Sequence, residues 1–338
     1  MTAICLTACS ASRKEAADTP QSTVIQETAE AANSLQEEET PETADVVSQE
    51  DSSAEVSGEP RSEILCLEST NAEGEEEKIE GVLYLPAPAS GEATETTGTE
   101  STESTESSVS GGPYPTVIIS HGFGGNYGFL TGNIARELAK HGYAAYAFNF
   151  RNPDTRSMLN TSVLTEAKTL NAVIDLIKQQ SFADPDAIYL LGESQGGFVS
   201  AYVAAMRTKQ ENDVRNLILF YPAFVLQDDA RERNPGYMEE GYQFAEEEII
   251  GTNKVSGMYS RDALSFDIYD LIADYTQDVL IIHGTADTVV PLSYSERALE
   301  VYQNAELITI EGAGHGFYGG PAFVSSIEDT VQFLDAHR

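Results

Sequence analysis

Residues 188–197 decide how this chain folds: Ile188-Tyr-Leu-Leu-Gly-Glu-Ser-Gln-Gly-Gly197, or IYLLGESQGG. An apolar run of strand length stops at Gly192, Ser194 follows two residues later, and two more glycines follow the serine. Residues 192–196 match G-x-S-x-G, a pattern that between a strand and a helix forms a tight turn and projects the serine hydroxyl above the sheet. Larger side chains at the glycine positions would collide with neighbouring backbone. We interpret Ser194 as a nucleophile; the alternative is a plain glycine-rich turn between a strand and a helix.

Apolar runs of strand length alternate with amphipathic helical stretches on both sides of this turn. The predicted strands are 116–120, 144–148, 187–191, 216–220, 278–282 and 306–310. The predicted helices are 130–141, 163–180, 196–208, 293–303 and 321–336. Strands that are apolar throughout and alternate with helices predict an α/β fold, with a mostly parallel sheet and helices on both faces. Residues 223–270 interrupt the alternation and are acidic and tyrosine-containing, so we predict that they form a small inserted cap.

Two segments of the chain are too polar to build a core. Residues 10–60 are rich in Glu, Thr, Ser, Ala and Gln, and we predict a disordered acidic tether there. Residues 86–114 include the run TESTESTESS. Short predicted strands at 64–68 and 81–85 lie between the two segments, so we interpret 86–114 as a loop inside a domain of residues 61–338. The alternative is a linker between two domains.

The charge of the chain excludes one class of partner. The 338 residues carry a formal net charge of −36, with 25 acidic and 4 basic side chains in residues 1–112 and 30 and 15 in residues 113–338. Phosphate binding needs clustered Lys and Arg, so no nucleic-acid partner is expected. The three cysteines, Cys5, Cys9 and Cys66, show no spacing typical of zinc. We expect neither a metal nor an organic cofactor.

The first nine residues, MTAICLTAC, end in Leu6-Thr-Ala-Cys9. This end resembles the lipobox of bacterial lipoproteins, whose cysteine becomes the lipidated N-terminus, and small residues before a cleavage point fit the secretory pattern. No Lys or Arg precedes it and the apolar stretch is short, so either the true start lies upstream or the match is chance. On the lipoprotein interpretation, Cys9 anchors an extracellular protein to the outer face of a bacterial cell membrane.

A serine nucleophile needs a base, and the base needs an acid to orient it. In strand–turn–helix serine enzymes the order along the chain is Ser, acid, His. Of the five histidines only His315 and His337 follow a candidate acid, and His337 is the penultimate residue at a predicted helix end. His315 lies just past the last strand, and Asp287 follows strand 278–282, so both lie where α/β sheets place their chemistry. We predict a Ser194–Asp287–His315 triad, with Glu311 as a second candidate acid.

Two backbone N–H groups are needed to stabilise an oxyanion. The residue after the nucleophile, Gln195, supplies one. The second is predicted at Phe123, in the loop His121-Gly-Phe-Gly-Gly125 after an early strand, whose glycines let the backbone approach a substrate closely. His121 and His283 each end a strand before a glycine, and we interpret both as structural.

Four motifs in this order, HGFGG, GESQGG, HGTADTVVP and GAGHGF, resemble the α/β-hydrolase superfamily over about residues 60–338, outside the insertion at 86–112. Within it, the HGF loop, the SQGG elbow and Tyr221-Pro-Ala223 are similar to those of bacterial feruloyl (cinnamoyl) esterases. The resemblance implies a serine esterase that acts on hydroxycinnamate esters, either small molecules or feruloylated polysaccharide. It also implies that the insert holds the aromatic acid.

By the same resemblance, the segments VLQDDA (225–230) and SGMYS (256–260) place Asp229 and Tyr259 on the phenolic group, with Asp228 competing for the role of Asp229. A solvated acidic loop is the alternative for the aspartate pair. Two other functions stay open at this point. One is a serine peptidase or acyl-peptide hydrolase, since the same triad cleaves amides. The other is a cell-surface binding protein that keeps the fold without turnover.

Overall fold

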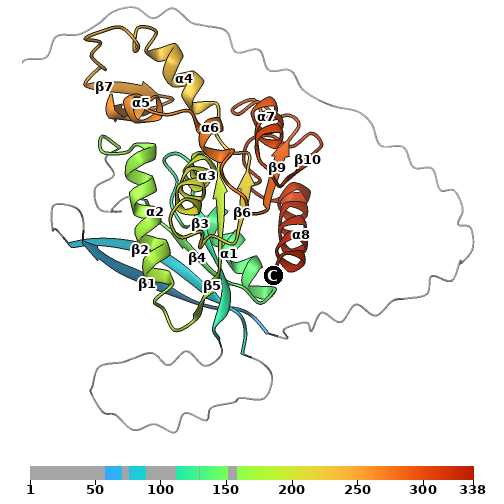
Figure 1. Cartoon of the computed structure of the whole chain (residues 1–338). Coiled ribbons are helices and arrows are strands. Elements are labelled where there is room, and N and C mark those ends of the chain that lie inside the picture. The colour runs from blue at the N-terminus through green and yellow to red at the C-terminus, as the bar shows by residue number, and fades with distance from the viewer. Residues whose placement is uncertain (1–57, 71–75, 89–111, 129, 151–157) are drawn as a thin grey trace, which may run out of the picture. The chain divides into compact units, whose positions relative to one another are not determined.

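The structure is a computed structural model of the chain, and it describes residues 58–70, 76–88, 112–128, 130–150 and 158–338 (Figure 1). The predicted lipid anchor at Cys9, nearly all of the predicted tether and most of the predicted loop at 86–114 lie outside the described residues. In the part of the chain that is described, no helix combines the length and the apolar character needed to cross a membrane.

The described residues form a large sheet with the strand order β1-β2-β4-β3-β5-β6-β9-β10. β1 pairs antiparallel with β2, β2 pairs antiparallel with β4, and every other neighbouring pair is parallel. The predicted mostly parallel α/β sheet is therefore confirmed. Its strands are β1 (Arg61–Thr70), β2 (Glu76–Leu85), β3 (Tyr114–Ser120), β4 (Ala144–Phe148), β5 (Ala183–Glu193), β6 (Asn216–Phe220), β9 (Val279–Gly284) and β10 (Ala305–Ile310).

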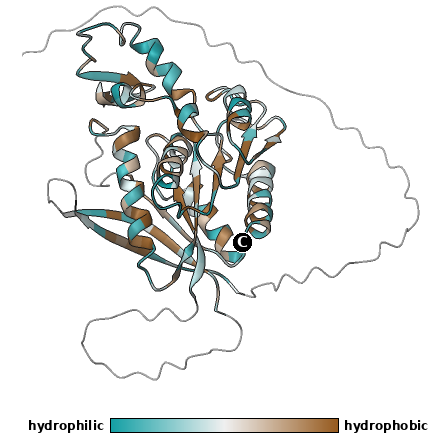
Figure 2. Cartoon of the chain, viewed as in Figure 1, coloured by the Kyte–Doolittle hydropathy of each residue, from teal (hydrophilic) through white to brown (hydrophobic). Residues whose placement is uncertain are grey.

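Helices cover both faces of the sheet, as predicted, and each face has its own apolar core. α1 (Leu130–Lys140) and α8 (Gly320–Ala336) pack on one face, and α2 (Val163–Ile177) and α3 (Gln195–Thr208) pack on the other. Ile118 of β3 lies in the α2–α3 core and its neighbour Ile119 in the α1–α8 core, because successive strand side chains point to opposite faces. Burial on both faces makes the central strands largely apolar (Figure 2).

The segment between β6 and β9 leaves the sheet and forms the cap (Figure 1). It contains α4 (Leu226–Arg233), a hairpin of β7 (Glu247–Ile250) and β8 (Asn253–Ser256), α5 (Met258–Ala263) and α6 (Ile268–Ile272), and α7 (Ser293–Val301) follows β9. The buried Gln227 of α4 holds the segment that joins α5 to α6. Its Nε2 donates to the carbonyls of Ala263 (2.7 Å) and Phe266 (2.5 Å), and its Oε1 accepts from the N–H of Ile268 (3.1 Å). α5 packs against α2 and α6 against α3, so the cap rests on α2 and on α3, the helix that begins at the turn of Ser194.

Candidate active site

Ser194 lies in the turn between β5 and α3 in a conformation that few residues adopt. Its φ of 52° and ψ of −119° lie outside the regions favoured by side chains larger than glycine. A Cβ atom on Gly192 would lie 2.3 Å from the carbonyl oxygen of Gly196, and one on Gly196 would lie 2.3 Å from the carbonyl oxygen of Ser120. Both glycines of the motif are therefore required by close backbone approach, as the sequence predicted.

The structure brings Ser194, His315 and Asp287 into one hydrogen-bonded chain. His315 Nε2 lies 2.9 Å from Ser194 Oγ, and His315 Nδ1 lies 2.7 Å from Asp287 Oδ2. With the Nδ1 proton donated to the carboxylate, Nε2 presents a lone pair to the serine hydroxyl. The three residues come from loops after β5, β9 and β10, which end at the same edge of the sheet.

Asp287 is buried and fixed by donors on both carboxylate oxygens. Oδ1 accepts from the N–H groups of Val289 (2.8 Å) and Val290 (2.9 Å). His283 lies behind the carboxylate: its Nε2 is 2.9 Å from the carbonyl of Val290 and 3.3 Å from Asp287 Oδ2, and its Nδ1 is 2.7 Å from the Ser295 hydroxyl. Burial lowers the pKa of His283 and favours the neutral ring. His283 thus has the structural role expected of it, in support of the acid.

The two predicted oxyanion donors flank Ser194. Gln195 is the first residue of α3, and the first N–H groups of a helix have no acceptor within the helix. The loop of Phe123 lies against the serine, because a Cβ on Gly122 would come within 3.2 Å of Ser194 Cβ. Among the described residues, no hydrogen-bond acceptor meets the N–H of Phe123. His121 supports this loop, with Nδ1 2.8 Å from the carbonyl of Gly122 and Nε2 3.3 Å from the N–H of Phe150.

The side chain of Gln195 connects the turn to the cap. Its Nε2 donates to Glu166 Oε2 on α2 at 2.7 Å, and its Oε1 accepts a short hydrogen bond from the hydroxyl of Tyr259 on α5. The ring of Tyr259 meets the ring of Phe123 edge-on, with centroids 5.5 Å apart. Tyr259 therefore touches both residues whose N–H groups are predicted to bind the oxyanion.

The structure places the two predicted phenol contacts differently. Tyr259 is 3% exposed and already donates its only hydroxyl proton, so it can meet a ligand hydroxyl only as an acceptor. Asp229 is exposed on α4. Asp228, the competing residue, is engaged by Arg231 (2.6 Å) and by the hydroxyl of Tyr294 (2.7 Å). Recognition of a phenolic group by Asp229 and Tyr259 stays a prediction.

Comparison with known proteins agrees with this fold. The profile of a family described as "alpha/beta hydrolase fold" matches residues 115–252, and that of a family described as "TAP-like protein" matches residues 267–334. Est1E from Butyrivibrio proteoclasticus superposes with a TM-score of 0.61 over 80% of this chain and 99% of Est1E, at 23% identity. The chain has the α/β-hydrolase fold.

Other solved structures similar to this chain share the fold at low identity. Est1E with ferulic acid bound has a TM-score of 0.59 at 23% identity, over 77% of this chain and 95% of that one. A dienelactone hydrolase from Anabaena variabilis has a TM-score of 0.54 at 16% identity, over 83% and 99%. No curated protein sequence matches this chain.

Sequence reasoning missed one buried carboxyl group beside the site, that of Glu193, which precedes the predicted nucleophile Ser194. Its Oε2 accepts from the hydroxyl of Tyr221 (3.1 Å) and its Oε1 from the N–H of Gly122 (3.4 Å). Burial raises the pKa of Glu193 to about 7, although both hydrogen bonds favour the ionised form. The residue is visible in G-x-S-x-G as the first x, but its partners lie 28 and 71 residues away in the sequence.

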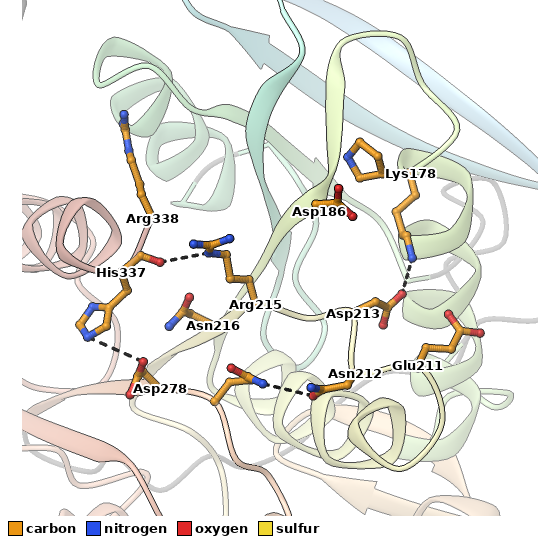
Figure 3. A pocket seen from close by; sticks show the side chains of 12 residues that line it. Lys178, Asp186, Glu211, Asn212, Asp213, Arg215, Asn216, Asp278, His337 and Arg338 are labelled. Carbon is orange, nitrogen blue, oxygen red and sulfur yellow. Dashed lines mark hydrogen bonds and ion pairs between the residues drawn. The ribbon is translucent and has the colours of Figure 1, made fainter.

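A polar pocket of about 620 Å³ lies at the opposite edge of the sheet (Figure 3). Asn216 begins β6 and Asp278 directly precedes β9, so this edge holds the amino ends of the strands. Its charged groups pair with one another: Lys178 Nζ lies 2.6 Å from Asp213 Oδ2, and His337 Nε2 lies 3.8 Å from Asp278 Oδ2 (Figure 3). This pocket is separate from the site at Ser194.

Beside that pocket, three carboxylates come close enough together to hold a metal ion, namely those of Asp175, Glu211 and Asp213. The guanidinium of Arg207 pairs with all three, at 2.8, 3.0 and 2.6 Å. The arginine therefore supplies the positive charge in this cluster.

Proposed function

We propose that this α/β hydrolase is a serine carboxylic-ester hydrolase that works through an acyl-enzyme. The observation that carries the proposal is the continuous hydrogen-bond chain from Ser194 through His315 to the buried Asp287. A serine hydroxyl is a weak nucleophile without a base, and here the base lies within hydrogen-bond distance and is itself oriented by a carboxylate.

In the proposed reaction, Ser194 Oγ attacks the ester carbonyl carbon while His315 Nε2 takes the hydroxyl proton. The N–H groups of Phe123 and Gln195 stabilise the oxyanion of the tetrahedral intermediate. The C–O bond to the alcohol then breaks, and His315 returns the proton to the leaving alkoxide. A water molecule, deprotonated by the same imidazole, attacks the acyl-enzyme, and the acid leaves with Ser194 restored.

We further propose hydroxycinnamate esters, free or carried on polysaccharide, as the substrates. Est1E, which has the same fold, has been solved with ferulic acid bound. In this chain Tyr259 and Phe123 form an aromatic pair next to the nucleophile, a surface suited to an aromatic acyl group. Asp229 and Tyr259 would meet the ring hydroxyl, and Cys9 would anchor the enzyme outside the cell.

The test is the initial rate of methyl ferulate hydrolysis by the full chain, with Ser194→Ala as the matched control. We expect turnover that disappears in the variant. A folded wild-type protein that leaves methyl ferulate intact but hydrolyses short-chain acyl esters would exclude the hydroxycinnamate proposal and keep the esterase. Hydrolysis of aminoacyl anilides alone would favour a peptidase. Failure of a fluorophosphonate to label Ser194 would overturn the serine-hydrolase proposal.

A further inference from the structure

The buried carboxyl group of Glu193 connects three segments of the site that the proposed mechanism uses. Glu193 precedes the nucleophile on β5, and its Oε1 accepts from Gly122 of the loop that carries Phe123. Its Oε2 accepts from the hydroxyl of Tyr221, which follows β6. Glu193 is 9% exposed, and its carboxyl group has no role in the proposed proton transfers.

Tyr221 carries this connection to the base. Its ring meets the His315 ring edge-on at a centroid distance of 4.7 Å and the Phe317 ring at 4.8 Å. Tyr221 is 1% exposed and has a φ of 37°, a conformation that persists only where the surroundings fix it. The phenol thus forms one wall of the space in which the imidazole sits.

We propose that Glu193 is a positioning residue, which holds the Phe123 loop through Gly122 and the His315 ring through Tyr221 in register around Ser194. The inference rests on the proposed function, because it concerns the rate at which Ser194 reacts. The side chains of Glu193 and Tyr221 are both buried, and neither takes part in the proposed proton transfers. Their effect passes through the oxyanion loop and the base, where a displacement of about 1 Å can cost roughly 100-fold in rate.

The protonation state of Glu193 changes how strongly the two links are held. An ionised carboxylate accepts on both oxygens, whereas a protonated one loses an acceptor site on the oxygen that carries the proton. Burial raises its pKa to about 7, so this change falls within the working range of an esterase. Two titratable groups interact with it directly, Tyr221 through the hydrogen bond and Tyr318 through its charge, and two histidines lie beside its partners: His121 next to Gly122 and His315 against the ring of Tyr221. Of these, His121 is a neutral imidazole by its hydrogen bonds, since Nδ1 donates to a carbonyl and Nε2 accepts from an N–H.

The test compares Glu193→Gln, Tyr221→Phe and the double variant with the wild type in the full chain. The readouts are kcat and KM on p-nitrophenyl acetate, the rate of fluorophosphonate labelling of Ser194, and the pH profile of kcat/KM. Tyr143→Phe is the matched control, because it removes a tyrosine–carboxylate hydrogen bond (Tyr143 to Asp335, 2.8 Å) remote from the site. Labelling per folded molecule keeps a loss of folding apart from a loss of rate.

We expect kcat and the labelling rate to fall about tenfold in each single variant with KM little changed, and no further in the double variant. On the acid side of the pH profile, kcat/KM of the wild type should fall more steeply than a single protonation allows. Glu193→Gln should reduce this slope to that of one proton. Single variants with wild-type kcat, losses that add in the double variant, or an unchanged acid limb would overturn the inference alone. A wild type that neither turns over an ester nor reacts with the fluorophosphonate would remove the proposed function and this inference with it.

Discussion

Replacing Gly196 by alanine should damage both the stability and the reactivity of the turn at Ser194. The new Cβ would lie 2.3 Å from the carbonyl oxygen of Ser120 and 2.5 Å from that of His121, about 1 Å short of an ordinary contact at 3.4 Å. Both neighbours are backbone atoms at the end of β3, so the turn must move instead. Overpacking of this kind costs about 1–3 kcal/mol, against a gain of at most about 1 kcal/mol from the helix propensity of alanine.

The displacement also separates Ser194 from its oxyanion donors, and a shift of about 1 Å can lower the rate roughly 100-fold. Thermal unfolding and the rate of fluorophosphonate labelling measure the two effects on one sample. Gly314→Ala is the matched control, because a Cβ there meets only one atom, at 4.0 Å. A Gly196→Ala protein with the wild-type Tm and labelling rate would show that the turn does not approach β3 closely, and the explanation of the motif given above would be wrong.

Three further outcomes are expected. Asp287→Asn should lower ester turnover roughly 10³- to 10⁴-fold by favouring the wrong imidazole tautomer of His315. Circular dichroism should stay unchanged, because the amide oxygen still accepts from the N–H groups of Val289 and Val290. Full activity would contradict the role of the acid. In urea titrations, Tyr259→Phe should lose about 1–2 kcal/mol by leaving the Gln195 amide oxygen without its donor, whereas Tyr302→Phe, whose buried hydroxyl has no partner among the described residues, should lose nothing. Folding raises the pKa of Glu193 from 4.5 to about 7, so the folded state binds this proton more tightly than the unfolded state does. The free energy of unfolding should therefore fall by up to about 3 kcal/mol between pH 4.5 and pH 7. Glu193→Gln should remove that fall, and equal pH slopes of stability in the two proteins would refute the prediction.

The sheet and its helices could be predicted because their patterns are local. Strands 144–148 and 216–220 are apolar apart from Asn216, and the structure reproduces their bounds in β4 and β6. The bounds differ at β5, which begins at Ala183 rather than Ala187. Its first residues, Asp184 and Asp186 among them, are polar because they lie beyond the cover of the helices.

The cap could be predicted only as an interruption of the alternation between strands and helices. Its elements are four to eight residues long, too short to show a period, and they are held by contacts such as that of Gln227 with Ala263. The same limit applies to Glu193 and Tyr221. Each residue is plain in the sequence, but its role depends on a partner brought close by the order of strands in the sheet.

The hydrogen bond from Tyr259 to Gln195 bears on whether the cap can be exchanged as a module. A chimera that carries the insert of another esterase, grafted to change acyl preference, would lose this tyrosine unless its replacement supplies one at the same place. The amide of Gln195 would then keep Glu166 but lose its donor, at the start of the helix that supplies an oxyanion N–H. Selectivity and speed are therefore not independent design variables in this enzyme, and a transplanted cap should retain Tyr259 if the recipient is to keep its turnover.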